Sequence, residues 1–183
     1  MAMHHALVAY VRGPAGEFVE RLRRELHPNR PPFPTHITVL PPRILRGTEA
    51  EARATLEHVC RSASPFEIVM GEVETFIPVT LTVFIRVAHG AYRMRELHDL
   101  LNNDSLRAEE EWPYMPHMTI AKMDDIEKAQ EAFRTAQERW AQYQGSRRVL
   151  IDQLTFVREA RQDTWEDLAP VPLGGSMALK PSF

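Results

Sequence analysis

The sequence predicts an α+β fold with two lobes, in which antiparallel sheets flanked by helices enclose a central cleft. Segments with strand-like alternation are interleaved with amphipathic helical segments along the 183 residues. Each half of the chain has the order strand, helix, strand, helix, strand, and the third element of each half contains a His-x-Thr pattern. Interleaved strands and helices are also typical of parallel βαβ units, but the duplicated order favours two lobes related by a pseudo-twofold axis. We therefore expect residues 1–183 to form one domain in which equivalent positions of the lobes face each other.

The first half has clear signals at the ends of its elements. Gly13-Pro14 follows the first strand, and apolar residues four apart then indicate a helix that ends before a proline-rich segment. Pro41-Pro42 is expected to close the second strand. Thr48 and Glu51 have the spacing of a capping box at the start of the next helix. In order, the predicted elements are a strand at 6–12, a helix at 17–26, a strand at 36–40, a helix at 48–60 and a strand at 66–73.

The second half repeats this order and is followed by a less regular end. The predicted elements are a strand at 81–87, a helix at 91–101, a strand at 116–122, a helix at 124–143, and strands at 149–157 and 164–168 that could pair as a hairpin. Residues 171–183 contain prolines and paired glycines without periodicity, so we expect an irregular C-terminal tail.

Composition and charge exclude several kinds of protein. The chain has 22 Lys and Arg against 25 Asp and Glu, whereas proteins that bind long nucleic acids usually have a clear basic excess. We therefore expect no long duplex as a partner, and we interpret most of the scattered arginines, including Arg21, Arg23 and Arg24, as helix-face or loop charges. The single cysteine, Cys60, excludes an internal disulfide and is expected to pack as a small apolar residue. The apolar runs are too short to cross a membrane and the N-terminus lacks signal-peptide features, so a cytoplasmic monomer with no membrane partner is expected.

The His-x-Thr pattern is the main functional signal. It occurs as His36-Ile37-Thr38-Val39 and again as His117-Met118-Thr119-Ile120, each time after a proline-containing approach. Side chains alternate along a strand, so the histidine and threonine of each copy lie on one face and the apolar residues on the other. One copy alone is a weak signal, because solvated strand faces often contain His and Thr. Two copies at equivalent places in facing lobes predict a site with two imidazoles and two hydroxyls.

These residue types suit acid–base chemistry at a phosphate. Imidazole titrates near pH 6.5, so one ring can be neutral while the other carries a proton. The neutral ring would take a proton from the nucleophile, and the charged ring would give one to the leaving oxygen. The hydroxyls of Thr38 and Thr119 would hold the non-bridging phosphate oxygens. This scheme needs no metal or other cofactor, and the sequence has no CxxC, HExxH or glycine-rich phosphate-loop motif.

With these two motifs the chain resembles the 2H phosphoesterase superfamily, which includes bacterial 2′-5′ RNA ligase-like proteins and cyclic nucleotide phosphodiesterases. The order of elements extends the resemblance over residues 3–170. The resemblance implies a bilobal α+β fold and metal-independent opening of 2′,3′-cyclic phosphates to 2′-phosphates. It also implies that His117 is the base that activates water and that His36 is the acid that protonates the 3′-oxygen.

Five further residues near the motifs are candidate substrate contacts: Phe33, Tyr114, Arg43, Lys122 and Arg86. The two aromatic residues precede the histidines and could stack on a base, and the Tyr114 hydroxyl could reach phosphate. Arg43 and Lys122 follow the two motif strands and could add positive charge. Arg86 is the single charge in an apolar run and could point into the cleft. A packed aromatic ring or a solvated charge is the alternative interpretation of each.

Several functions are compatible with these features. The leading hypothesis is a 2′,3′-cyclic phosphodiesterase acting on RNA ends or small nucleotides, and thus in RNA processing. The same scaffold could instead join RNA ends as a 2′-5′ ligase. A non-catalytic module that binds nucleotides or RNA ends is a third alternative, although a pure binder has no need of two proton-transfer groups. A structural domain without a ligand is a fourth.

Overall fold

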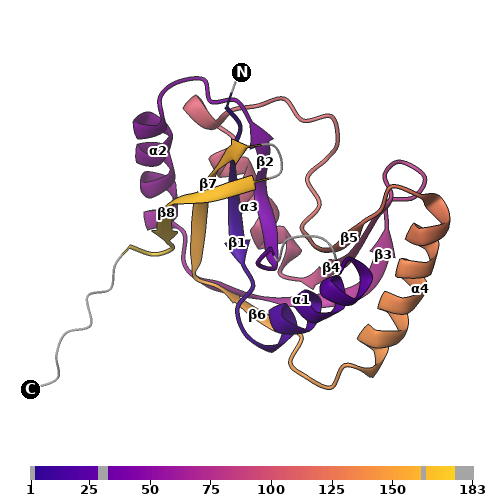
Figure 1. Cartoon of the computed structure of the whole chain (residues 1–183). Helices are drawn as coiled ribbons and strands as arrows, with labels where there is room; N and C mark the ends of the chain where they lie inside the picture. Colours follow the sequence, from indigo (N-terminus) through magenta and orange to yellow (C-terminus); the bar gives the residue numbers. More distant parts are fainter. Residues whose placement is uncertain (1–2, 29–32, 162–163, 176–183) are drawn as a thin grey trace, which may run out of the picture.

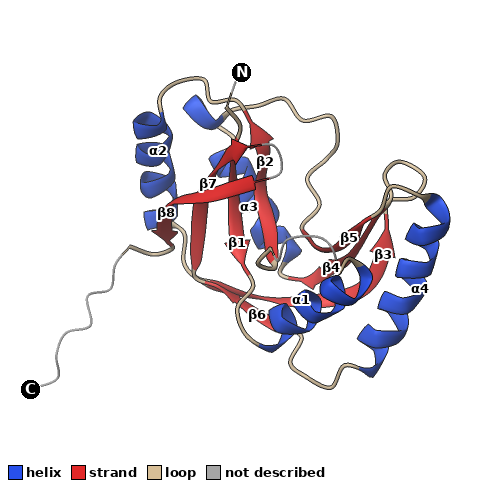
Figure 2. Cartoon of the chain, viewed as in Figure 1, coloured by secondary structure: helices blue, strands red, loops and turns tan. Residues whose placement is uncertain are grey.

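The computed structural model describes residues 3–28, 33–161 and 164–175, which form one antiparallel sheet covered by helices (Figure 1). The strands are β1 (His5–Tyr10), β2 (His36–Arg43), β3 (Phe66–Thr75), β4 (Thr82–His89), β5 (His117–Lys122), β6 (Arg148–Ile151), β7 (Gln153–Arg161) and β8 (Thr164–Pro172). The helices are α1 (Pro14–Leu26), α2 (Glu49–Ser62), α3 (Ala91–Leu101), the short 3₁₀ helix η1 (Asp104–Leu106) and α4 (Ile126–Gln142). The eight strands lie in the order β6-β3-β4-β5-β2-β1-β7-β8, and the sheet curls strongly (Figure 2). The predicted α+β class is confirmed.

The two halves of the chain exchange elements across the middle of the sheet. The first half runs from β1 to β3 and the second from β4 to β7. β3 pairs with β4 and β7 pairs with β1, so each half contributes its last strand to the other lobe. α1 packs against β5 and α3 against β2, so a helix of one half covers the histidine-bearing strand of the other. The repeated order therefore folds around a pseudo-twofold axis between β2 and β5, where the two His-x-Thr strands meet.

β2 is longer than predicted, because it continues through Pro41-Pro42. His5 in β1 pairs with Arg43 beyond the prolines, and the register shifts next to this pair. A bulge of this kind accommodates residues that lack a backbone donor, and the two proline side chains are only partly buried or exposed. The prediction that the prolines end the strand is wrong.

The strand predicted at 149–157 is in fact two strands. β6 pairs with β3 in one lobe, whereas β7 pairs with β1 in the other. The buried side chains change phase between them, from Val149 and Ile151 to Leu154 and Phe156. Since side chains alternate strictly along one strand, this phase change marks the place where the chain leaves one lobe for the other.

The predicted hairpin near the C-terminus is confirmed, because β7 and β8 pair along most of their length. β8 extends to Pro172, so the first two residues of the expected irregular tail belong to a strand. Residues 176–183 of that tail lie outside the described residues.

The main core fills the space between the sheet and the helices. It contains Trp140 of α4, Leu56 of α2 and the apolar residues of both His-x-Thr motifs, each at most 1% exposed. Cys60 is buried in the same core, as predicted. The predicted capping box at the start of α2 is confirmed, since Thr48 and Glu51 each accept a hydrogen bond from the other's backbone amide.

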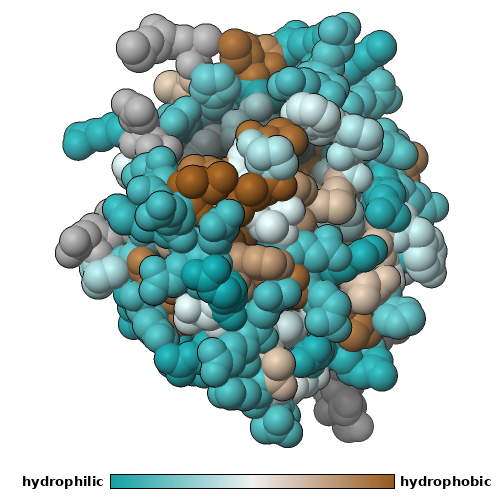
Figure 3. Space-filling view, turned by 90° about the vertical axis from the view of Figure 1, so that its right-hand side faces the viewer, coloured by the Kyte–Doolittle hydropathy of each residue, from teal (hydrophilic) through white to brown (hydrophobic). Residues whose placement is uncertain are grey.

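The face of the molecule in Figure 3 is mostly hydrophilic. Figure 3 shows one face on which apolar side chains gather at the edge of a hollow, surrounded by polar residues. Among the described residues, no helix is both long enough and apolar enough to cross a membrane.

Candidate active site

β2 and β5 place the polar side chains of both motifs on one face of the sheet. Within the described chain these strands are joined at a single residue pair, Ile37 with Met118. Both of these side chains are fully buried, so the histidine and threonine of each motif lie on the opposite face. The antiparallel register around the pair puts each histidine beside the threonine of the other motif. The structure thus brings together the four residues singled out by the sequence.

Both imidazoles are held in the same tautomer. His36 Nδ1 lies 2.9 Å from the carbonyl oxygen of Pro34, and His117 Nδ1 lies 2.8 Å from the carbonyl oxygen of Met115. A carbonyl oxygen only accepts, so each Nδ1 carries a hydrogen and donates it. In the neutral ring Nε2 is then the basic nitrogen, and no described residue forms a hydrogen bond with Nε2 of either ring. Each histidine therefore offers Nε2 for proton transfer.

The surroundings of both rings favour the neutral form. Burial, followed by the positive charges of Arg23, His117 and Lys122, lowers the pKa of His36 from 6.5 to about 4. Burial and the nearby Lys122 ammonium also lower the pKa of His117. The Arg23 guanidinium lowers the pKa of His36 but does not act on His117, so a first proton favours His117 in the free protein. A phosphate bound between the rings would raise both pKa values, because its negative charge stabilises an imidazolium.

Aromatic rings flank both histidines. Beside the first, the rings of Phe33 and Tyr10 have centroids 5.0 and 6.5 Å from the imidazole centroid. Beside the second, Phe76 and Phe84 lie at 5.2 and 5.0 Å. Phe33 is one of the predicted contacts, whereas the other three are not. Tyr10 and Phe84 come to the site by pairing opposite motif residues on neighbouring strands, and that register is not visible in the sequence.

Lys122 and Arg86, two predicted contacts, lie beside the site. Lys122 is exposed, and its ammonium is close enough to lower the pKa of both histidines. Arg86 is the cross-strand partner of His117, so its side chain lies on the same face of the sheet. It donates a hydrogen bond to Glu74 at 3.1 Å, and both side chains are substantially exposed. The Lys122 ammonium therefore acts on both imidazoles, whereas the Arg86 guanidinium is paired with Glu74.

Arg43 and Tyr114, also predicted contacts, are engaged inside the protein. Arg43 is 4% exposed, and its guanidinium donates to Asn102 Oδ1 at 2.7 Å, to Glu110 at 2.5 Å and to backbone carbonyls. The Tyr114 hydroxyl donates to the carbonyl oxygen of Thr38 at 3.0 Å. These contacts hold the Arg43 side chain against the end of α3 and η1, and the Tyr114 side chain against β2.

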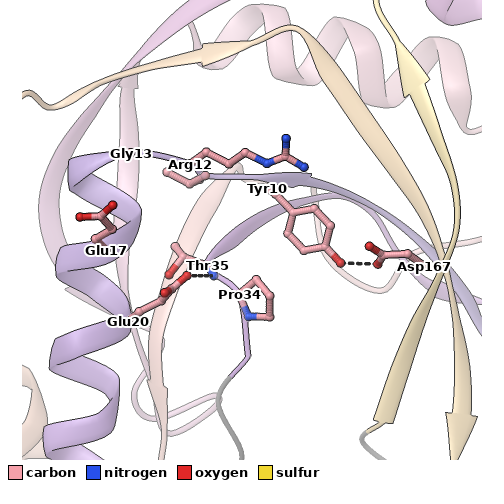
Figure 4. Close-up of a pocket in the computed structure, with 9 residues that line it drawn as sticks. Tyr10, Arg12, Gly13, Glu17, Glu20, Pro34, Thr35 and Asp167 are labelled. Atoms are coloured by element: carbon pink, nitrogen blue, oxygen red, sulfur yellow. Dashed lines mark hydrogen bonds between the residues drawn. The ribbon is translucent and has the colours of Figure 1, made fainter.

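A hollow of about 420 Å³ is lined in part by Tyr10 and Pro34, which both contact His36, but by none of the four motif residues (Figure 4). Its lining consists of Tyr10, Val11, Arg12, Gly13, Glu17, Glu20, Pro34, Thr35 and Asp167. The Tyr10 hydroxyl donates to Asp167 at 2.5 Å, and the Thr35 amide donates to Glu20 at 3.2 Å. Within the described ranges, no three His, Cys, Asp or Glu side chains are grouped as a metal site requires. The hollow has room for part of a substrate, and its three carboxylates disfavour a second phosphate there.

The position of Arg23 beside the site could not be predicted from the sequence. Its guanidinium donates to the carbonyl oxygens of Phe33, Thr119 and Ile120 at 2.6, 2.8 and 3.3 Å. Arg23 is therefore an exception to the interpretation of most scattered arginines as helix-face or loop charges. Arg23 has the helical spacing of an ordinary surface residue, and only the packing of α1 on β5 brings it between the motifs.

Comparison with known proteins gives the same fold and the same family. The chain is 20% identical to the protein named "Putative phosphoesterase BH1439" of Halalkalibacterium halodurans over 174 residues, which is 94% of this chain and 98% of that one. It is 28% identical to "Putative phosphoesterase" of Bacillus pumilus over 127 residues, covering 68% of this chain and 74% of that protein. Among solved structures, E. coli LigT complexed with ATP has a TM-score of 0.62 at 12% identity, with 94% of this chain and 99% of that chain covered.

The fold and the two motifs thus agree with a family assignment. The family model described as the 2′-5′ RNA ligase superfamily matches residues 11–163, which includes both His-x-Thr strands and all four α-helices. The match confirms the resemblance drawn from the two motifs. The chain belongs to the 2′-5′ RNA ligase superfamily, that is, to the 2H phosphoesterases.

Proposed function

We propose that this protein is a phosphodiesterase that opens the 2′,3′-cyclic phosphates of small nucleotides or RNA ends to 2′-phosphates. The observation that carries the proposal is the matched pair of imidazoles, each with Nδ1 bonded to a backbone carbonyl and Nε2 available on one face of the sheet. The curated relatives, which are named as phosphoesterases, support a phosphoester as substrate. The solved LigT complexes with NADP⁺, ATP and 3′-AMP support small nucleotides as ligands.

The proposed reaction gives the two histidines the roles that the family resemblance implies. The neutral Nε2 of His117 takes a proton from water as the water oxygen attacks phosphorus, and the P–O3′ bond breaks on the opposite side. Protonated His36 gives its proton to O3′, which leaves as a hydroxyl, so the products are a 2′-phosphate and a free 3′-hydroxyl. The hydroxyls of Thr38 and Thr119 donate to the non-bridging oxygens and keep phosphorus in line between the rings. All of these groups are side chains, so this scheme calls for no metal.

His36 can act as the acid only when its ring carries a proton. In the free protein the first proton goes to His117, because the pKa of His36 is lowered to about 4. The proton therefore has to move to His36 when substrate binds. A phosphate close to the His36 ring would achieve this by stabilising the imidazolium there.

The same pKa shifts predict an acidic optimum for kcat/KM, the quantity that reports on the free enzyme. The catalytic form carries one proton on the pair. It is populated between the pKa of His36, about 4, and that of His117, which lies below 6.5. We expect kcat/KM to fall as the pH rises through the region below 6.5. The corresponding fall in kcat is expected at higher pH, because bound phosphate raises both pKa values. Initial rates from pH 4 to 8.5 measure both limbs. A limb of kcat/KM above 6.5 would contradict the lowered pKa values.

The hollow beside His36 favours a small substrate. Glu17, Glu20 and Asp167 line it, against one cation, Arg12. A ribose or a base could fill this space, whereas the next phosphate of an RNA chain would meet like charge there. We therefore propose cyclic mononucleotides as better substrates than longer RNA ends, in agreement with the net charge of −3.

The proposal is tested by following the four 2′,3′-cyclic nucleotides with phosphorus NMR, with EDTA present. The expected product is the 2′-phosphate, formed without added metal. A 3′-phosphate would show that the other bridging oxygen leaves and would contradict the scheme. Failure to convert any of the four would contradict the proposed activity on small nucleotides. Addition of an oligonucleotide with a free 5′-hydroxyl tests 2′-5′ ligation in the same sample, because the 5′-hydroxyl would take the place of water as the nucleophile while the same P–O3′ bond breaks.

A further inference from the structure

The spacing of the two motif strands must be held by contacts other than strand pairing. In the described chain β2 and β5 share one residue pair, after which the strands separate. Beyond that pair the two strands offer each other no paired backbone donors, so carbonyls that face the gap need donors from elsewhere. Thr38 and Thr119 occupy equivalent positions in the two motifs, and each of their carbonyl oxygens accepts a hydrogen bond from a side chain instead.

Arg23 supplies the donors on one side. Its Nη2 donates to Thr119 O at 2.8 Å and its Nε to Ile120 O at 3.3 Å, both in β5. Its Nη1 donates to Phe33 O at 2.6 Å, three residues before His36. The planar fork of an arginine suits several carbonyls at once, which a lysine ammonium cannot match in geometry. Arg23 thus ties the approach to the first motif to the strand of the second.

Tyr114 makes the reciprocal connection. It lies three residues before His117, and its hydroxyl donates to Thr38 O in β2 at 3.0 Å. Its ring stacks on the imidazole of His98, with centroids 4.3 Å apart and an interplanar angle of 2°. Both nitrogens of His98 contact carboxylates, Nδ1 that of Asp99 and Nε2 that of Glu110, so the stacking surface is itself held in place. Tyr114 thus ties the approach to the second motif to the strand of the first.

We infer that Arg23 and Tyr114 are positioning residues that set the separation of His36 and His117 by bracing each motif against the other. The inference rests on the proposed function for its kinetic consequences, but the bracing itself concerns the geometry of the two rings. In-line transfer is sensitive to that geometry, since a displacement of about 1 Å can cost roughly 100-fold in rate. Arg23 has a second effect, because its charge is one of the causes that lower the pKa of His36.

The test compares Arg23→Lys, Arg23→Met and Tyr114→Phe with two exposed controls, Arg24→Met and Tyr92→Phe. For each, kcat and KM are measured with a 2′,3′-cyclic nucleotide, and the ring protons of His36 and His117 are titrated by NMR. Tyr114→Phe keeps the stacked ring and is expected to lower kcat on the order of tenfold with little change in KM or pKa. Arg23→Lys should lower kcat while the pKa of His36 stays low, whereas Arg23→Met should lower kcat and move that pKa up toward 6.5.

If Arg23→Met does not fold, Arg23→Lys and Tyr114→Phe still test the inference. It is overturned if folded Arg23→Lys and Tyr114→Phe both keep kcat within about twofold of the parent protein, a change smaller than bracing requires. It is equally overturned if the two exposed controls lose as much activity. Should the parent protein open no cyclic phosphate, the proposed function fails, but the NMR arm still decides. The ring resonances of His36 and His117 must then shift in Arg23→Lys and Tyr114→Phe and stay in place in the controls, and unchanged resonances would overturn the bracing.

Discussion

His36→Ala and His117→Ala are each expected to lower kcat for a 2′,3′-cyclic nucleotide by a factor on the order of 10² to 10⁴. Each imidazole offers one Nε2 for proton transfer, and no other described side chain takes that place on the same face of β2 or β5. Both variants should fold, since both rings are only partly buried and the apolar motif residues that form the core are untouched. Turnover by phosphorus NMR and thermal unfolding are measured together. The matched control is His89→Ala, at the exposed end of β4, and this variant should keep full activity.

The two histidine variants are separated by a substrate in which sulfur replaces the bridging 3′-oxygen. A thiolate leaves without protonation, so this substrate needs a base but no acid. His36→Ala should recover much of its lost rate on the sulfur substrate, whereas His117→Ala should not. Recovery of His117→Ala instead would reverse the two roles. If both variants bind nucleotide less tightly than the parent protein and no turnover is seen in any of them, the protein is a binding module rather than an enzyme.

Thr38→Val and Thr119→Val are each expected to lower kcat/KM on the order of 10²-fold. Valine keeps the shape and the β-branch of threonine, so the strand and its register should persist while one donor to the phosphate oxygens is lost. Part of the loss should appear in KM, because the non-bridging oxygens are already charged in the bound substrate. Steady-state kinetics of each variant give both parameters.

The serine variants test whether the hydroxyl itself is responsible. Thr38→Ser and Thr119→Ser retain a donor at the same position and should recover most of the activity. Thr164→Val, at the exposed start of β8, removes a threonine hydroxyl far along the sheet order and should have no effect. Valine variants with parental kinetics would remove the threonines from the phosphate site.

The class of fold and the centre of the site could be predicted because both depend on local patterns that occur twice. Alternation of side chains placed the histidine and threonine of each motif on one strand face, and duplication of the element order placed the two motifs at equivalent positions. The start of α2 was equally local, since its capping box involves residues three apart. The hairpin of β7 and β8 joins neighbouring segments and could be predicted for the same reason.

Other features depended on which distant strands pair, and local patterns do not contain that information. β2 continues past Pro41-Pro42 because β1 extends alongside it, and the segment around Asp152 divides because its two parts join different lobes. Tyr10 and Phe84 reach the histidines through cross-strand register. In each case a partner far away in the sequence decided the outcome.

The sequence by itself determined the α+β class and the four motif residues, because strand periodicity and the repeated pattern are properties of short segments. The tertiary structure alone decided what holds those residues in place. Arg23 reads as a helix-surface charge and Tyr114 as a candidate ligand contact, until the exchange of helices and strands between the halves brings them to carbonyls of β5 and β2. The physical reason is that a carbonyl facing the gap between β2 and β5 needs a donor from outside the two strands, and only the assembled fold shows which donor lies within reach.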